Sequence, residues 1–299
     1  MATKKTPAKK PAKAATKKPA AKASATKTPA AKKATVKTKP VEKAAPAKKV
    51  AEKKPAEKKP AQMALSVNDV DVGYNGIPVI RNISLQIPHG QTFGLIGLNG
   101  VGKTTLIKSI LGLRDTYKGH IEVFGIHSWE RAARNEIAYL PERFDPPWFL
   151  TGYEFIEFSS RLYNHNVKRK DIHDLCDRLN LDREALKRRA NTYSKGMRQK
   201  LGLIATVLTP CRILLLDEPM SGLDPMARVA VKDVLILCKE KGKTVFLSSH
   251  ILADLDELCQ GIAVMHGGML PYKGTPEGLK QQTGHKTLER AFLHLIMPP

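Results

Sequence analysis

Nine consecutive residues combine the side chains and the glycine spacing that phosphate binding requires. They are Gly97, Leu98, Asn99, Gly100, Val101, Gly102, Lys103, Thr104 and Thr105. Their order matches the pattern GxxxxGK[ST] at each fixed position. Glycines let backbone N–H groups point at phosphate oxygens, and a following helix adds the positive end of its dipole. Lys103 would neutralise the β- and γ-phosphates and the Thr104 hydroxyl would bind Mg²⁺, so the sequence predicts a nucleoside triphosphate site.

A pair of adjacent carboxylates follows the apolar run 213–216. Asp217 and Glu218 would stand at the C-terminal end of a buried strand, the edge at which ligands bind in open α/β sheets. Asp217 is predicted to hold Mg²⁺, directly or through water, and Glu218 to polarise an attacking water. An Asp-Glu pair after a strand also occurs in solvated loops, but the phosphate-binding pattern about 110 residues upstream favours the catalytic interpretation.

The surrounding patterns indicate the elements that would hold these residues. Three short apolar runs lie at residues 92–96, 213–216 and 244–247. They lack alternation, as strands covered on both faces do, whereas residues 82–87 alternate and predict a half-buried antiparallel strand. Apolar residues in the segment 171–180 recur at helical spacing. We therefore expect a mainly parallel sheet with helices on its faces and an inserted helical subdomain at about 142–194.

Positive charge is concentrated at the start of the chain. The 299 residues contain 50 Lys+Arg and 28 Asp+Glu, and residues 1–62 hold 20 lysines with only three acids. This segment consists mostly of Ala, Lys and Pro and has no aromatic residue, so it cannot bury enough apolar surface to fold and is predicted to be disordered. Residues 63–299 are nearly balanced in charge and are long enough for one α/β domain with a full core or for two coupled subdomains.

Composition also disfavours several classes of protein. No run of 18 apolar residues that would span a bilayer is present. The first lysines are not followed by the apolar segment of a secretory signal, and a transit peptide is disfavoured because the tail has no arginine. The four cysteines are scattered without CxxC spacing, which favours reduced thiols over a zinc site or a disulfide framework.

Further motifs resemble those of the ATP-binding cassette (ABC) ATPases, over roughly residues 65–299. Tyr74 precedes Lys103 by 29 residues, where the family has an aromatic residue that stacks on adenine. The other matches are Tyr193-Ser194-Lys195-Gly196-Met197 at the LSGGQ signature, Ser221-Gly222-Leu223-Asp224 at the D-loop and Ser248-Ser249-His250 at the switch histidine. The order of these motifs along the chain is that of the family.

The resemblance implies a P-loop ATPase fold with a mainly parallel core sheet, an antiparallel β subdomain and an inserted helical subdomain. It implies ATP and Mg²⁺ as ligands and a second cassette, either an identical copy or a paralogue, packed head to tail. Ser194, Gly196 and Asp224 would then contact ATP bound to the P-loop of the other cassette. His250 would sense the γ-phosphate and hold the attacking water together with Glu218.

Two places depart from the family pattern. The signature has Lys195 and Met197 where Gly and Gln are common, although the Ser and the second Gly remain. Glu142 stands where most relatives have Gln. Its carboxylate still offers an oxygen to Mg²⁺ or to water at the nucleotide, but it adds negative charge beside the carboxylate pair and the triphosphate. We expect slower turnover or a shifted pH optimum relative to a Glu142→Gln variant.

The resemblance implies the ATP-hydrolysing subunit of an ABC transporter, bound peripherally to separate transmembrane permease subunits on the cytoplasmic face of the cell membrane. The variants YSKGMRQK and YLPE and the terminal LERAFL resemble the export-type branch. The competing interpretation is a soluble ABC ATPase that acts on DNA or ribosomes through its basic tail. One cassette per chain, without a long coiled-coil or zinc insertion, argues against it.

Two segments of the sequence allow more than one interpretation. Residues 1–62 resemble the tails of linker histones in composition, and would contact anionic lipid or nucleic acid or only increase solubility. Seven aromatic residues lie between Phe144 and Tyr163, including Trp148 and Phe149. They would either pack the helical subdomain or line a groove next to Glu142 that receives a short helix of a membrane partner.

Overall fold

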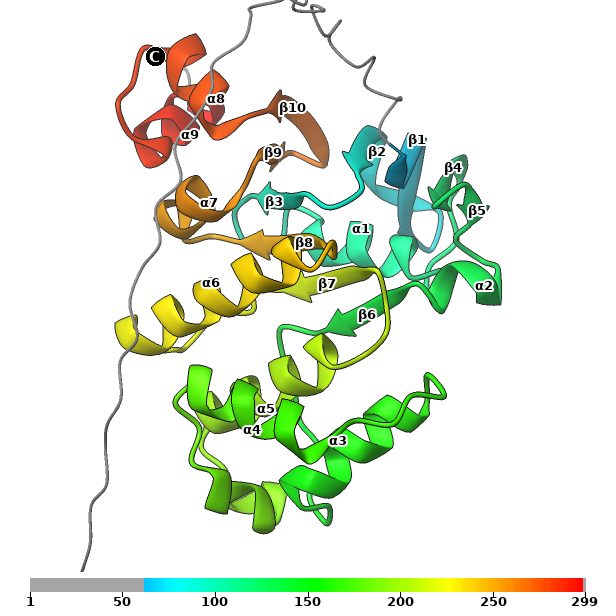
Figure 1. The fold of residues 1–299 in the computed structure, drawn as a ribbon. Coiled ribbons are helices and arrows are strands. Elements are labelled where there is room, and N and C mark those ends of the chain that lie inside the picture. Colours follow the sequence, from blue (N-terminus) through cyan, green and yellow to red (C-terminus); the bar gives the residue numbers. More distant parts are fainter. Residues whose placement is uncertain (1–61, 298–299) are drawn as a thin grey trace, which may run out of the picture. The chain divides into compact units, whose positions relative to one another are not determined.

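The computed structural model describes residues 62–297, and Figure 1 shows how their strands and helices are arranged. The predicted disordered tail, residues 1–62, lies outside the described residues apart from Gln62. The first strand begins at Met63, and the Gln62 carbonyl accepts a hydrogen bond from the backbone of His89.

A six-stranded core sheet has the strand order β10-β9-β3-β8-β7-β6. Its strands are β3 (Thr92–Ile96), β6 (Ile137–Leu140), β7 (Ile213–Asp217), β8 (Thr244–Ser249), β9 (Gly261–His266) and β10 (Met269–Gly274). All neighbours pair in parallel except β9 and β10, which pair antiparallel. Every residue of β3, β7 and β8 is buried, which confirms the strands predicted from the three apolar runs.

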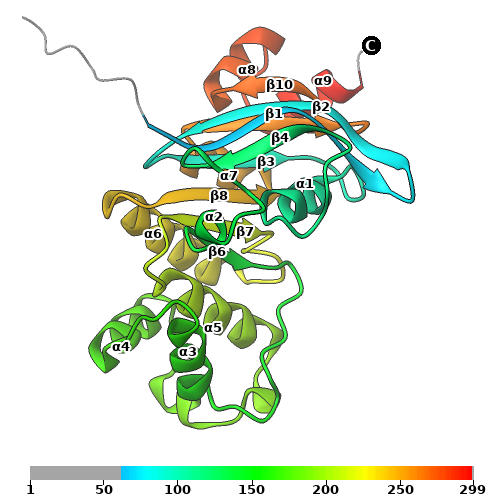
Figure 2. The same ribbon diagram turned by 90° about the vertical axis from the view of Figure 1, so that its right-hand side faces the viewer.

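A second, four-stranded sheet is antiparallel and has the order β2-β1-β4-β5. It consists of β1 (Met63–Tyr74), β2 (Ile77–Pro88), β4 (Lys118–Val123) and β5 (Ile126–His127). In β2 the side chains of Ile83, Leu85 and Ile87 are buried, while those of Asn82 and Gln86 are exposed, as the alternating pattern predicted. Figure 2 shows this sheet lying above helix α1 (Lys103–Ile110).

Helices cover the core sheet, and a group of them extends beyond its β6 end (Figures 1 and 2). That group comprises α3 (Gly152–Arg161), α4 (Arg169–Arg178), the short 3₁₀ turns η1 (Arg183–Lys187) and η2 (Ala190–Thr192), and α5 (Lys195–Val207). The others are α2 (Arg131–Arg134), α6 (Pro225–Glu240), α7 (Leu252–Leu258), α8 (Pro276–Thr283) and α9 (Leu288–Ile296). In residues 62–297 no helix combines the length and the apolar character that crossing a bilayer requires.

The predicted inserted helical subdomain is therefore present, with helices from α3 to α5. Its helix α4 starts two residues before the predicted segment and ends at Arg178, because Asn180 adopts a left-handed conformation with φ of 50° that ends the helix. Alternate residues of the buried strands point to opposite faces of the core sheet and belong to two different hydrophobic cores. Leu214 and Leu216 of β7 face the helical side, whereas Leu215 packs with the antiparallel sheet and α1.

Candidate functional site

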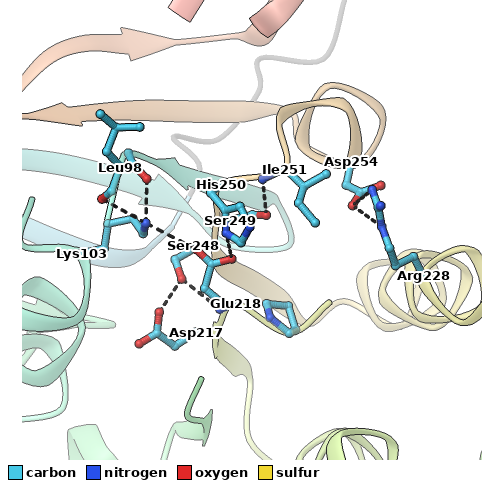
Figure 3. A network of polar contacts seen from close by, with 12 residues as sticks. Leu98, Lys103, Asp217, Glu218, Arg228, Ser248, Ser249, His250, Ile251 and Asp254 are labelled. Carbon is cyan, nitrogen blue, oxygen red and sulfur yellow. Dashed lines mark hydrogen bonds and ion pairs between the residues drawn. The ribbon is translucent and has the colours of Figure 1, made fainter. Parts of the chain in front are cut away.

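The loop between β3 and α1 has the backbone that its glycines allow. Gly100 and Gly102 have φ of 82° and 109°, values that residues with a side chain rarely adopt. A Cβ on Gly102 would also lie only 2.4 Å from Cγ2 of Ile80 in β2. The loop encloses the ammonium group of Lys103, which donates hydrogen bonds to the carbonyls of Gly97 at 2.7 Å and Leu98 at 3.4 Å. The P-loop thus holds its own lysine at its centre (Figure 3).

Asp217 lies at the end of β7, next to the P-loop. Its side chain is buried, and its Oδ2 accepts a hydrogen bond of 2.9 Å from the hydroxyl of Thr104. Ser248 is the register partner of Asp217 on β8; its hydroxyl donates to Oδ1 of Asp217 and accepts the backbone N–H of Glu218 at 3.0 Å. Sequence reasoning named Ser248 only as part of the switch motif and missed this bridge, because only the register of β7 and β8 reveals it.

Glu218 follows in a left-handed conformation with φ of 51°, and only 5% of the residue is exposed. Its Oε2 lies 2.8 Å from Nδ1 of His250, and its Oε1 lies 3.4 Å from Nζ of Lys103. That second contact is an ion pair without hydrogen-bond alignment, so Oε1 is a buried carboxylate oxygen that has no hydrogen-bond donor within residues 62–297. A left-handed backbone at a non-glycine residue is costly, and such strain concentrates at functional sites. The arrangement leaves one oxygen of Glu218 available for a water.

A cavity of about 320 Å³ unites the two predicted sites. Its lining comprises Val79, Leu98, Asn99, Gly100, Gly102, Lys103, Thr104, Thr105, Glu142, Asp217 and Glu218. Glu142, just after β6, is thus brought to the P-loop as the resemblance implied. Val79 of β2 was not predicted, and no motif in the sequence identifies it. Of the other predicted residues, Gly97 and Val101 belong to the loop, and Tyr74 and His250 stand outside the lining.

The signature and the D-loop pack against each other, and none of their residues lines this cavity. Ser194 caps α5 and accepts the Met197 N–H at 3.2 Å, and Asp224 caps α6 and accepts the Ala227 N–H at 2.9 Å. The side chain of Lys195 lies over Gly222, where a Cβ would meet the Lys195 ammonium at 2.9 Å. Ser194, Gly196 and Asp224 are therefore not brought to the P-loop of their own chain.

The charges around the cavity fit a triphosphate with Mg²⁺. The hydroxyl of Thr104 and the carboxylate of Asp217 are hard oxygen donors 2.9 Å apart, the ligand type that Mg²⁺ prefers beside phosphates. Burial, followed by the negative charges of Asp217 and Glu142, raises the pKa of Tyr139 on β6 to about 12. The carboxylates thus make this corner of the cavity electronegative, and a bound cation would offset that charge.

A P-loop joined to a buried Asp-Glu pair and a switch histidine, within a core sheet that carries an antiparallel sheet and a helical subdomain, defines an ATPase of the ATP-binding cassette class. The family model described as ABC transporter matches residues 80–221. Over 239 residues the chain is 34% identical to the ABC-type transporter ATP-binding protein EcsA of Bacillus subtilis, covering 77% of this chain and 96% of EcsA. The chain belongs to the family of ABC transporter ATP-binding proteins.

Two further comparisons extend this result. An uncharacterised ABC transporter ATP-binding protein of Synechocystis is 37% identical over 66% of this chain, but the match spans only 56% of that relative's length. A solved structure described as the ATP binding subunit of an ABC transporter superposes with a TM-score of 0.69 at 30% identity, covering 78% of this chain and 99% of that chain. The predicted α/β P-loop fold with its antiparallel sheet and helical subdomain is confirmed.

Proposed function

We propose that this chain is the ATP-hydrolysing subunit of an ABC transporter and drives a separate membrane permease. The observation that carries the proposal is the meeting of Lys103, the Thr104–Asp217 pair and the Glu218–His250 pair at one edge of the core sheet. These groups supply the cation, the metal ligands and the base that phosphoryl transfer to water needs.

In the proposed reaction Lys103 leaves the loop carbonyls and binds the β- and γ-phosphates of ATP. Glu218 then orients a water through its Oε1 and accepts the proton of that water as the water attacks the γ-phosphorus. The bond between the γ-phosphorus and the bridging oxygen of the β-phosphate breaks at the same time, so that ADP leaves and inorganic phosphate is formed. His250 holds the Glu218 carboxylate through Oε2 and faces the γ-phosphate. Bound Mg²⁺, held by Thr104 and Asp217 and reached by Glu142 directly or through water, would neutralise charge on the phosphate oxygens.

The proposal includes a second cassette packed head to tail, either an identical copy or a paralogue. It is supported by the position of the signature away from the cavity of its own chain. Ser194, Gly196 and Asp224 carry N–H and oxygen groups at the starts of α5 and α6, where helix dipoles favour an anionic γ-phosphate. Such a dimer would close each ATP between the P-loop of one cassette and the signature of the other.

The permease is proposed to dock beside Glu142, on the helical subdomain. Phe144 and Phe155 pack into the core, so part of the aromatic cluster serves packing. Trp148 and Phe149, however, are 65% and 55% exposed, and such apolar exposure favours a protein partner. We place the subunit on the cytoplasmic face of the membrane and in the export-type branch on the motif resemblances alone.

Affinity purification of the intact chain from its own cells in mild detergent tests the proposal. A stoichiometric membrane-spanning protein should copurify at high salt and after nuclease treatment. The double variant Trp148→Ala/Phe149→Ala should lose this partner and keep ATP hydrolysis, whereas the control Trp129→Ala, which changes an exposed tryptophan on another face, should retain it. Recovery only of nucleic acid or ribosomes, lost with nuclease, would support the soluble alternative and a nucleic-acid role for residues 1–62.

A further inference from the structure

The segment that follows α1 contacts Tyr74 through an arginine that no motif identified. The guanidinium carbon of Arg114 lies 4.1 Å from the centroid of the Tyr74 ring, within the range of a cation–π contact. The Nε atom of Arg114 is buried and has no hydrogen-bond partner among the residues that the structure describes. The contact with the side chain of Tyr74 therefore compensates in part for the unpaired Nε of this guanidinium.

The same segment also holds the turn that carries Tyr74. The backbone N–H of Gly76 donates to the hydroxyl of Tyr117 at 3.1 Å, and the N–H of Tyr117 donates to the carbonyl of Asp71 at 2.7 Å. Asn75 and Gly76 have φ of 51° and 80°, the conformation of a tight two-residue hairpin turn between β1 and β2. Residues 114–117 therefore fix both the turn and the ring at its end.

Tyr74 lies next to the nucleotide cavity. A hydrogen bond with Thr105, which lines the cavity, is the main cause that lowers the pKa of the Tyr74 hydroxyl. The residue is 37% exposed, and the guanidinium covers one face of its ring. A planar base can therefore stack on the opposite face without displacing Arg114.

We infer that Arg114 is a positioning residue for the base of the bound nucleotide: it supports Tyr74 from behind, so that the purine stacks on a ring already held in place. The inference rests on the proposed function, since it assumes ATP at the P-loop and adenine on Tyr74. A ring fixed before binding loses less conformational freedom when the base arrives, which favours affinity. The base would then form the outer layer of a stack whose middle layer is Tyr74 and whose inner layer is Arg114.

Binding of ATP and of tripolyphosphate to the full chain tests this inference, because tripolyphosphate contacts the P-loop but has no base. In Arg114→Ala the Kd for ATP should rise about three- to tenfold, the size of a cation–π contact, while the Kd for tripolyphosphate stays the same. Arg114→Lys should recover most of the ATP affinity. The matched control Arg178→Ala, an exposed arginine of α4, should change neither Kd.

Unchanged or tighter ATP binding in Arg114→Ala would overturn the inference, and tighter binding would mean that the guanidinium occupies the face that adenine needs. Equal weakening of both ligands would overturn it as well, because it would indicate damage to the P-loop. Tyr74→Ala distinguishes a failure of the role assigned to Arg114 from a failure of ATP binding itself. If it weakens ATP binding and Arg114→Ala does not, only the role of Arg114 fails. If neither the wild type nor any variant binds ATP, the proposed function fails.

Discussion

The Nζ atom of Lys103 lies 3.4 Å from Oε1 of Glu218, so the cation expected to bind phosphate is paired with the carboxylate expected to activate water. Both side chains are buried, with 7% and 6% of their areas exposed. A triphosphate entering the P-loop competes for the lysine and releases that oxygen. Binding of a nucleotide would therefore separate Lys103 from Glu218 and leave Oε1 of Glu218 to contact the attacking water.

Replacing Glu218 by Gln removes the proposed base while keeping the size of the side chain. We expect Glu218→Gln to bind ATP, to lose hydrolysis by at least about 100-fold, and to accumulate as an ATP-bound dimer, because general-base contributions are of that order. Phosphate release and size-exclusion chromatography with ATP measure both effects. Glu289→Gln on the exposed face of α9 serves as the control. Full turnover in Glu218→Gln would show that another group is the base.

Glu142 adds a carboxylate to the cavity that Asp217 and Glu218 already line. Glu142→Gln should hydrolyse ATP faster than the wild type at neutral pH, because it removes repulsion from the triphosphate. The measurement is a pair of pH–rate profiles, with Glu240→Gln at the exposed end of α6 as control. Identical profiles for wild type and Glu142→Gln would contradict the prediction.

Tyr139 should make stability fall in alkaline solution. Burial and nearby carboxylates raise its pKa to about 12, above the ordinary value of 10 that applies to the unfolded chain. Between these values the unfolded state loses the phenol proton and the folded state keeps it, so stability present below pH 10 is lost as the pH rises toward 12. Tyr139→Phe has no phenol proton to lose, so this loss of stability at alkaline pH should be absent in it.

Urea unfolding at pH 9 and pH 11 tests the sign of this effect. From pH 9 to pH 11 the wild type should lose about 1 kcal/mol more stability than Tyr139→Phe, since one pKa unit corresponds to about 1.4 kcal/mol. A stability difference between the two proteins that is the same at both pH values would exclude a raised pKa at Tyr139.

Asp254 in α7 joins the switch region to α6. It is 4% exposed and accepts hydrogen bonds from Nε and Nη2 of Arg228 at 3.1 and 2.7 Å, with Lys232 at 3.7 Å (Figure 3). Asp254→Ala leaves Arg228 without its carboxylate, while Lys232 keeps its pair with Glu257, and should lower the free energy of unfolding by about 3 kcal/mol. Urea denaturation measures the loss.

The control for this variant is Asp177→Ala, which breaks the exposed pair with Arg183. Ion pairs exposed to water contribute little to the free energy of unfolding, so the urea midpoint of Asp177→Ala should stay close to that of the wild type. Equal destabilisation by the two substitutions would mean that burial does not determine how much the ion pairs of Asp254 contribute to the free energy of unfolding.

The parts of the site that were predicted from sequence are those that a local pattern specifies. Glycine spacing specifies the P-loop backbone, and an apolar run followed by Asp217 and Glu218 places two carboxylates at the edge of the sheet. The bridge made by Ser248 and the ion pair of Lys103 with Glu218 depend on strand register and on side-chain directions across the sheet. Arg114 lies outside any motif, and only the fold brings it to Tyr74.

The order of strands in the core sheet also governs when the site can form during synthesis. Strand β8 lies between β3 and β7, so the strand that ends in the P-loop and the strand that ends in the carboxylates become neighbours only through a segment made later than both. A growing chain that has not yet reached Ser249 cannot align Lys103 with Glu218. We therefore expect a nascent chain that ends before β8 to lack the aligned pair of Lys103 and Glu218, and an ordered nucleotide site with it.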